Sequence, residues 1–407
     1  MTVVHKQRCK LMLGLALSSF YLIVVSLLLP FRLAAQEAEQ ITLAYGLESY
    51  DFQHLLDTFT LQTGIIVNVK SFKNNELKSE LIQRSTIKQL PDAIIVPSDF
   101  LGIDELRPSV IPNSLINKNV SKVALNTAKV KGELKGIPIV FGNHLVLYYN
   151  KSLVTTAPST WQQLIKEQSN FSKPSNYIAW SYMEMYWFIP FLGVYDSVPY
   201  ENGQIKLNTN EMISAFKWYK SLRDNKVVDT NCDYECANNR FKAGELAMTI
   251  NGVWEYQANR TALGDKLGVA SLPLKDNKHM RPYFSSHVIA FPDESLAGPK
   301  GKALRRLAAF FQTENTQETI GLDLNTVPTN EVSLNFVKQQ SPADFDVMYK
   351  QIQNANPMPN EREMAIVWEA LLKGLNRYLA GVFDAKTAVE YMQHVAEKSV
   401  NKESNDE

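Results

Sequence analysis

The chain lacks an excess of charge of either sign. Its 407 residues hold 42 lysines and arginines against 42 aspartates and glutamates, so the formal net charge is zero. Proteins that attract nucleic acid or anionic membrane surfaces over long range carry a basic excess. The balanced composition therefore predicts no nucleic-acid partner, and the length allows two or three domains.

The sequence also lacks the motifs of several enzyme classes. It has no nucleophile elbow, no phosphate-binding P-loop and no His-Glu-x-x-His zinc motif. A glycosidase needs two carboxylates facing one bond, and no acidic pair is singled out by its spacing. His144, His279 and His287 each stand alone, as structural histidines more often do than ligands. We therefore expect a protein that is not an enzyme, with no cofactor and no metal; a glycan-acting enzyme is the alternative.

A long apolar run stands at the N-terminus. Basic residues at 6, 8 and 10 precede the run from Leu11 to Leu29, Pro30 breaks it, and residues 33–35 read Leu-Ala-Ala. This order is typical of a secretory signal peptide over residues 1–35, cleaved after about Ala35. The run is also long enough to span a bilayer, so an uncleaved anchor is the alternative. Cleavage would release a periplasmic protein.

Cysteine is scarce, with three in the chain. Cys9 precedes the apolar run, so it cannot be the lipidated cysteine of a lipoprotein signal, which must sit at the cleavage point. Cys232 and Cys236 remain after cleavage, and an oxidising compartment permits them to pair across a small loop near a helix start. Two free thiols are the alternative. A metal site is not indicated, because no histidine or second cysteine pair lies nearby in sequence.

The stretch from Gly132 to Trp161 organises the chain. Residues 139–141 and 145–149 are two runs of strand-forming apolar residues, and Gly142-Asn143 interrupts them. A long, bent, buried segment of this kind can leave one sheet and enter another. We interpret it as a crossover between two lobes, with Gly142 and Asn143 as a hinge that absorbs rotation when the lobes close.

The preceding segment alternates strand and helix patterns. Strands are predicted at 41–45, 65–69 and 93–96, with helices at 52–62 and 74–84 between them. This order opens an α/β fold with a mostly parallel sheet. Ligands bind beyond the carboxyl ends of such strands, so the loops at 46–50 and 97–102 are candidate ligand loops.

Three stretches carry a family resemblance. The crossover has a Gly-x-Leu turn, a proline before the strand, a Tyr-Asn-Lys exit and then Pro-x-Thr-Trp. Residues 241–254 read FKAGELAMTINGVW, and Met358-Pro359-Asn360 is followed by Trp368. Together they resemble the maltose-binding protein family, periplasmic solute-binding proteins that serve ABC transporters. The resemblance covers roughly Ile41 to Glu397.

The resemblance implies an α/β, two-lobe periplasmic binding protein fold with hinge crossovers and an interlobe ligand cleft. The lobes would comprise 41–141 plus about 287–340, and about 146–285 plus 344–397. The polar tail at 398–407 is predicted to be disordered.

The implied function is capture of a sugar, such as maltose or a maltodextrin, for an inner-membrane ABC permease. We expect the protein to act as a monomer. Presentation of the ligand to a chemoreceptor or sensor kinase is the alternative.

Sugar sites combine flat aromatic faces with planar polar groups. Trp254 follows an Asn-Gly turn at a strand end, where the corresponding tryptophan of the family stacks on sugar; core packing is the alternative. Trp368 lies where the family places another stacking tryptophan, although helical aromatics are usually core. Tyr186 and Glu184 match the aromatic-and-acid pair of the family, again with core packing as the alternative.

In the first lobe the match is looser. Asp99 aligns with a carboxylate that binds sugar hydroxyls, with a helix cap as the alternative. Glu48 and Tyr50 fall near the first ligand loop of the family. Val96 and Phe100 stand where the family has a tryptophan and an arginine, and Gly142-Asn143 stands where an acidic residue is expected. These departures leave the identity of the sugar open.

Overall fold

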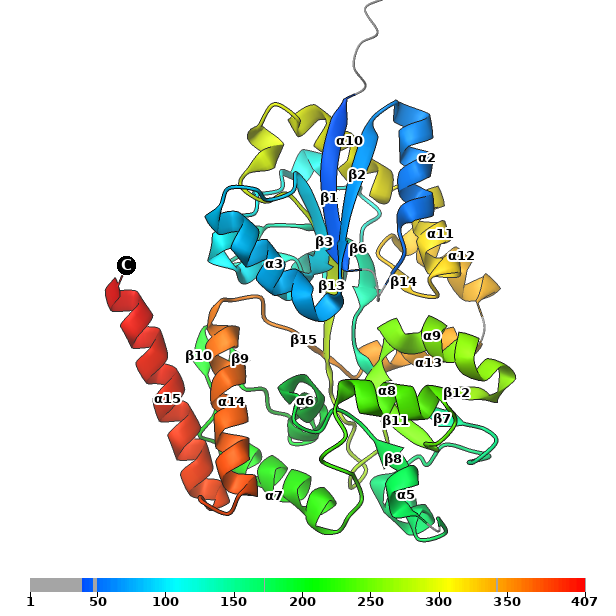
Figure 1. Ribbon diagram of the computed structural model, residues 1–407, viewed down its shortest axis with the longest axis vertical. Helices are drawn as coiled ribbons and strands as arrows, with labels where there is room; N and C mark the ends of the chain where they lie inside the picture. The colour runs from blue at the N-terminus through cyan, green and yellow to red at the C-terminus, as the bar shows by residue number, and fades with distance from the viewer. Residues whose placement is uncertain (1–38, 47–49, 172, 342, 407) are drawn as a thin grey trace, which may run out of the picture.

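The computed structural model describes residues 39–46, 50–171, 173–341 and 343–406. They form two α/β lobes, one above the other in Figure 1. The segment interpreted as a signal peptide, residues 1–35, lies outside the described residues. Within the described ranges, no helix combines the length and the apolar character needed to cross a bilayer.

The first lobe is built on a seven-stranded sheet in the order β14-β6-β13-β3-β1-β2, with β15 paired to β13. β1 is parallel to β2 and β3, as the alternating sequence predicts, whereas β13 is antiparallel to both β3 and β6. The strands are β1 (Gln40–Gly46), β2 (Ile66–Phe72), β3 (Ala93–Pro97), β6 (Ile137–Gly142), β13 (Tyr283–Ala290), β14 (Val327–Pro328) and β15 (Asn356–Pro357). β13 therefore lies in the middle of this sheet and joins β6 to the other strands.

Alternation along the strands divides the first-lobe core into two layers. Ile41 and Leu43 pack in one layer with α2 and α10, whereas Ala44 and Ile94 pack in the other with α3. Successive strand side chains point to opposite faces, so apolar residues at both parities bury both faces of the sheet. The helices of this lobe are α2 (Gln53–Thr63), α3 (Asn74–Thr86), α4 (Lys122–Asn126), α10 (Gly301–Phe311), α11 (Glu314–Asp323) and α12 (Glu331–Gln340).

The second lobe has a four-stranded sheet in the order β12-β7-β11-β8. Its strands are β7 (Leu145–Asn150), β8 (Ile178–Ala179), β11 (Met248–Gly252) and β12 (Leu267–Ala270). Its helices are α5 (Trp161–Gln168), α6 (Met185–Gly193), α7 (Asn210–Asp224), α8 (Tyr234–Lys242), α9 (Tyr256–Leu263), α13 (Ala343–Ile352), α14 (Glu363–Leu379) and α15 (Ala385–Asp406). Three aromatic residues before α6, namely Tyr177, Trp180 and Tyr182, lie in the core of this lobe. Tyr182 stacks there on Tyr219 with ring centroids 4.1 Å apart.

Short hairpins complete the fold. They are β4 (Lys129–Val130) with β5 (Glu133–Leu134) and β9 (Tyr200–Glu201) with β10 (Gln204–Ile205). Two short 3-10 turns, η1 (Ser98–Gly102) and η5 (Val253–Glu255), follow β3 and β11 directly. These turns lie at strand ends, which is where the sequence places candidate ligand residues.

Two of the crossings between the lobes run along or between strands. β6 ends at Gly142 in the first-lobe sheet and β7 begins at Leu145 in the second. β13 starts at Tyr283 in the second-lobe core and reaches Ile289 in the first-lobe core. Between β6 and β7, Asn143 adopts φ 37° and its Nδ2 donates a hydrogen bond to Ser285 Oγ at 2.8 Å. The two crossings are thus bonded to each other.

Gly142 should resist replacement, because its φ of 126° is rarely adopted by L-residues and a Cβ there would lie 3.1 Å from His144 Nδ1. We expect Gly142→Ala to lower the free energy of unfolding by ~1–3 kcal/mol, measured by urea denaturation. Gly132→Ala is the matched control, since Gly132 has φ 84° with open space around it and adds backbone strain alone. If Gly142→Ala lost no more unfolding free energy than Gly132→Ala, the contact with His144 would add nothing to the cost.

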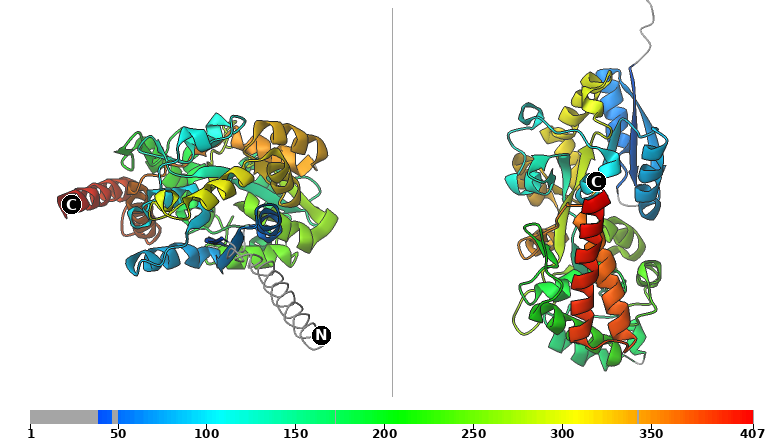
Figure 2. Two further views of the ribbon diagram at one scale, coloured as in Figure 1. Left: turned by 90° about the horizontal axis from the view of Figure 1, so that it is seen from above. Right: turned by 90° about the vertical axis from the view of Figure 1, so that its left-hand side faces the viewer.

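The C-terminal segment corrects one expectation. α14 and α15 lie side by side along the second lobe, and α15 continues to Asp406 (Figure 2). The segment from 398 to 406 is therefore helical, where its polar composition predicted disorder. A helix that is already nucleated gains one hydrogen bond for each added residue, so a polar extension can remain helical without a core of its own.

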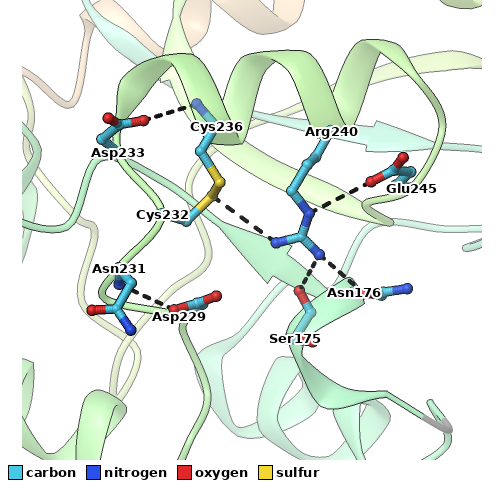
Figure 3. The surroundings of a disulfide bond; sticks show 9 residues. All are labelled: Ser175, Asn176, Asp229, Asn231, Cys232, Asp233, Cys236, Arg240 and Glu245. Atoms are coloured by element: carbon cyan, nitrogen blue, oxygen red, sulfur yellow. Dashed lines mark hydrogen bonds and ion pairs between the residues drawn. A yellow bond between two sulfur atoms is a disulfide. The ribbon is translucent and has the colours of Figure 1, made fainter.

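Cys232 and Cys236 are joined by a disulfide directly before and within the first turn of α8 (Figure 3). The Asp233 side chain caps this helix by accepting a hydrogen bond from the Cys236 amide at 2.9 Å. Further along α8, Arg240 donates to the Ser175 carbonyl and to Asn176 Oδ1, both at 3.0 Å. The disulfide and the cap thus constrain the start of α8, and Arg240 holds its last turn to residues 175 and 176.

Candidate functional site

A cavity of about 930 Å³ lies between the two lobes. The first lobe contributes Tyr45, Gly46, Tyr50, Phe52, Lys73, Leu77, Ile95, Pro97, Asp99, Phe100 and His287. The second lobe and the crossover contribute Asn143, Glu184, Tyr186, Trp187, Tyr234, Glu235, Asn238, Asn239, Lys242, Trp254, Glu255, Ala258 and Met358. Binding pockets for small ligands usually measure ~300–1,000 Å³, so this volume suits a ligand of more than one ring.

The first-lobe wall is built from the carboxyl ends of parallel strands. Tyr45 and Gly46 end β1, Pro97 ends β3, and Asp99 lies in the turn that follows. This is the edge where open α/β sheets bind ligands. Burial raises the pKa of the Asp99 carboxyl, while the charge of Lys78 opposes that rise.

Tyr50 and His287 form a second part of this wall. Their rings meet edge to face with centroids 4.9 Å apart, and both side chains are buried. Within the part of the chain that the structure describes, neither Tyr50 Oη nor His287 Nδ1 has a hydrogen-bond partner. Burial raises the pKa of Tyr50 and lowers that of His287 to about 4, so both side chains are neutral at pH 7.

The second-lobe wall is aromatic. The ring of Trp254 lies 6.2 Å from that of Tyr186 and 6.3 Å from that of Trp187. Trp254 is half-buried and packs against the apolar clusters of both lobes. Its indole folds back over Gly252, where an added Cβ would lie 2.2 Å from the ring. A glycine before the turn therefore permits this position of the ring.

Tyr186 ties the aromatic wall to the crossover. Its hydroxyl donates to the Asn143 carbonyl at 2.5 Å and lies 3.3 Å from the Tyr283 carbonyl. Glu184 precedes α6 at the same wall, and burial raises the pKa of its carboxyl. Asp99 and Glu184 thus face the cavity from opposite lobes as partly desolvated acceptors for hydrogen bonds.

One face of α8 completes the second-lobe wall. Its five cavity residues are spaced as a single helical face, and they are Tyr234, Glu235, Asn238, Asn239 and Lys242. Lys242 Nζ lies 3.8 Å from Glu255 Oε2, and the Tyr234 hydroxyl donates to Glu255 Oε1 at 2.6 Å. The face therefore offers amide, carboxylate and ammonium groups beside the aromatic rings.

The structure brings most of the sequence-predicted residues to this cavity. Trp254, Tyr186, Glu184, Asp99, Tyr50 and Asn143 line it, and Gly142 is adjacent to Asn143. The disulfide lies at the start of α8, which lines the cavity. Glu48 lies outside the described residues.

Trp368 is the exception. It does not line the cavity, and its ring packs edge-on against Tyr283 with centroids 6.1 Å apart, in contact with the second-lobe core. Trp368, which lies on α14, therefore packs on neighbouring side chains, as aromatic residues on helices usually do.

The residues that sequence reasoning missed include the α8 face and, in the first lobe, Tyr45 and His287. The helix begins at Tyr234, because Asp233 caps it. An aspartate three residues before Cys236 was the available signal. Tyr45 ends a predicted strand and so could have been proposed, whereas nothing in the sequence marks His287 within the apolar strand β13.

Within the described ranges, no group of three or more His, Cys, Asp and Glu side chains is arranged to hold a metal ion. The cavity instead combines flat rings with hydrogen-bond donors and acceptors from two lobes. Such an arrangement can hold a polyhydroxylated ring compound by stacking on its faces and bonding its edges.

Comparisons with known proteins agree with this architecture. A family model described as bacterial extracellular solute-binding protein matches residues 54–346. The maltooligosaccharide ABC transporter solute-binding lipoprotein of Streptococcus pneumoniae R6 is 24% identical over 383 residues, covering 88% of each chain. The maltodextrin-binding protein MdxE of Bacillus subtilis is 23% identical over 379 residues, covering 82% of this chain and 85% of its own.

A solved structure shows the same fold. The maltose/maltodextrin-binding domain MalE from Bdellovibrio bacteriovorus, bound to maltotriose, superposes with a TM-score of 0.78 at 23% sequence identity. The match covers 89% of this chain and all of that one. The two-lobe α/β fold expected from the sequence is thereby confirmed.

Proposed function

Because the chain belongs to the bacterial extracellular solute-binding protein family, we propose that it captures an oligosaccharide of the maltodextrin class and delivers it to an ABC permease in the inner membrane. In this proposal residues 1–35 direct export and are removed, and the mature protein acts in the periplasm as a monomer without catalysing a reaction. The composition of the interlobe cavity carries the proposal.

Both lobes contribute groups suited to sugar. Trp254 and Tyr186 offer aromatic faces for the apolar C–H face of a pyranose, and Asp99 and Glu184 offer carboxylates for its hydroxyls. A partly desolvated carboxylate regains, from a ligand hydroxyl, hydrogen bonds that it lost on leaving water. Relatives named as binding maltooligosaccharide and maltodextrin support the choice of sugar class.

A ligand that touches both walls stabilises the closed form, because it makes its full set of contacts there. In the proposed mechanism Gly142 and Asn143 absorb the rotation, since they lie between the sheet of one lobe and the sheet of the other. The permease would then recognise the closed form.

Calorimetric titration and thermal unfolding with a sugar panel test the proposal. The panel includes glucose, maltose, maltotriose, longer maltooligosaccharides and β-linked oligosaccharides of equal length. We expect saturable binding of α-linked oligosaccharides, with a stabilisation of about 2.7 kcal/mol when the ligand is at a hundred times Kd. No heat and no stabilisation with any oligosaccharide would refute the sugar assignment.

A further inference from the structure

Trp254 lies on the three-residue turn η5, which has few backbone hydrogen bonds to hold it. One specific contact of its polar atom orients it: the indole Nε1–H donates to Tyr234 Oη at 3.0 Å. Tyr186 and Trp187 touch the ring with tilted or edge geometry and do not bond its nitrogen. The Tyr234 oxygen is thus the hydrogen-bond acceptor that the structure gives the indole nitrogen.

The Tyr234 hydroxyl has a fixed direction. Its oxygen lies 2.6 Å from Glu255 Oε1, and a carboxylate can only accept a hydrogen bond. The phenolic proton must therefore point at Glu255, which leaves the oxygen lone pairs for the indole. Burial and the nearby Glu255 charge raise the pKa of Tyr234, so the phenol keeps this proton at neutral pH. Glu255 itself is held near Lys242.

The backbone of Tyr234 is also fixed. It lies between the two cysteines of the disulfide, and Asp233 caps the helix that Tyr234 begins. Cys232 is buried, and Arg240 anchors the same helix to residues 175 and 176. The backbone at Tyr234 is therefore more constrained than it would be on a free loop.

We propose that Tyr234 is a positioning residue, whose hydroxyl holds the Trp254 indole at the angle needed to stack on a sugar ring. The disulfide-closed start of α8 serves this role by fixing the position of that hydroxyl. The proposal rests on the proposed sugar-binding function for its effect on affinity, but the hydrogen bond itself exists without a ligand.

Tyr234→Phe tests the proposal, because it keeps the ring in the cavity wall and removes one oxygen. We expect the affinity for maltotriose, measured by calorimetry, to fall roughly five- to thirtyfold through loss of one oriented hydrogen bond. In a Trp254→Phe background, which has no indole nitrogen, the same change should alter affinity less than twofold. Equal losses in both backgrounds would mean that Tyr234 bonds the sugar directly, and would overturn the proposal.

Tyr256→Phe is the matched control. The Tyr256 hydroxyl also lies within hydrogen-bond distance of a carboxylate, Asp344 Oδ2 at 3.1 Å, but the side chain does not line the cavity. This variant should leave affinity unchanged. If it reduced affinity as much as Tyr234→Phe, a general effect of losing a buried hydroxyl would replace the positioning role.

A ligand-free readout separates this proposal from the sugar assignment. The indole Nε1–H resonance of Trp254 is assigned by its loss in Trp254→Phe, and its exchange with solvent is followed by NMR in the unliganded protein. We expect Tyr234→Phe to shift this resonance and speed its exchange at least tenfold. An unchanged resonance would overturn the positioning role even if sugar binds, and a changed one would support it even if no sugar binds.

Discussion

Replacing Trp254 by alanine should weaken oligosaccharide binding by roughly ten- to a thousandfold. Truncation removes a stacking face from the second-lobe wall, and each ~1.4 kcal/mol lost corresponds to a factor of ten in Kd. Calorimetry gives the affinity, and urea denaturation without ligand gives the stability. Because Trp254 is half-buried, we expect its loss to cost less stability than the ~3–5 kcal/mol typical of a buried tryptophan.

Trp368→Ala provides the contrast. Trp368 packs on Tyr283 and does not line the cavity, so its truncation should lower stability while affinity stays within a factor of about two. If Trp254→Ala instead lost stability and kept its affinity, its ring would be a core element. The sugar assignment would then rest on the similarity to named relatives.

Acidification should destabilise the fold between pH 6.5 and pH 4. His144 and His287 are buried, and burial lowers the pKa of each to about 4, against an ordinary unfolded value of about 6.5. The unfolded chain therefore binds more protons in this window, so stability is complete above pH 6.5 and is lost as pH falls. The loss should reach roughly 2.5 kcal/mol for each histidine at pH 4.5.

Two carboxyls at the cavity act with the opposite sign. Burial raises the pKa of Asp99 and of Glu184, so the folded form of each binds its proton more readily than the unfolded form, and acidification favours folding there. The net acid response is therefore smaller than the sum of the two histidine terms. Single substitutions separate the contributions.

Urea denaturation at pH 7 and pH 4.5, followed by tryptophan fluorescence, measures the acid response. His144→Gln and His287→Gln should each reduce the difference in unfolding free energy between the two pH values by roughly 2.5 kcal/mol. His54→Gln is the control, since His54 is exposed on α2. Equal acid responses in all three variants would show that the buried histidines do not govern the effect.

The architecture could be predicted from sequence because it follows from local patterns. Alternating apolar runs predicted β1, β2 and β3, and the interrupted run around Gly142 predicted a passage between two sheets. The first-lobe ligand loops follow from the same reasoning, since strand ends fix where loops lie. Asp99 was accessible in this way, because its turn directly follows β3.

Other parts of the site depend on contacts distant in sequence. A tryptophan on a helix can line a cavity or pack in a core, and helical spacing alone does not show which applies to Trp368. His287 reaches the cavity because β13 pairs between β3 and β6, which no local pattern reveals. The α8 face depends on a helix start that a single capping aspartate sets, and helix boundaries are the least certain part of any pattern.

The central place of β13 has a consequence for the order in which the two sheets form. All four strands of the second-lobe sheet lie between residues 145 and 270, so that sheet can be completed from a continuous segment. The first-lobe sheet cannot, because β13 begins at residue 283 and, until it arrives, β6 has no link to the β3-β1-β2 group. Closing such a long loop is entropically costly and slow. The first-lobe sheet, although its strands begin first in the chain, is therefore expected to form after the second-lobe sheet, with the edges of β3 and β6 open to chaperones until then.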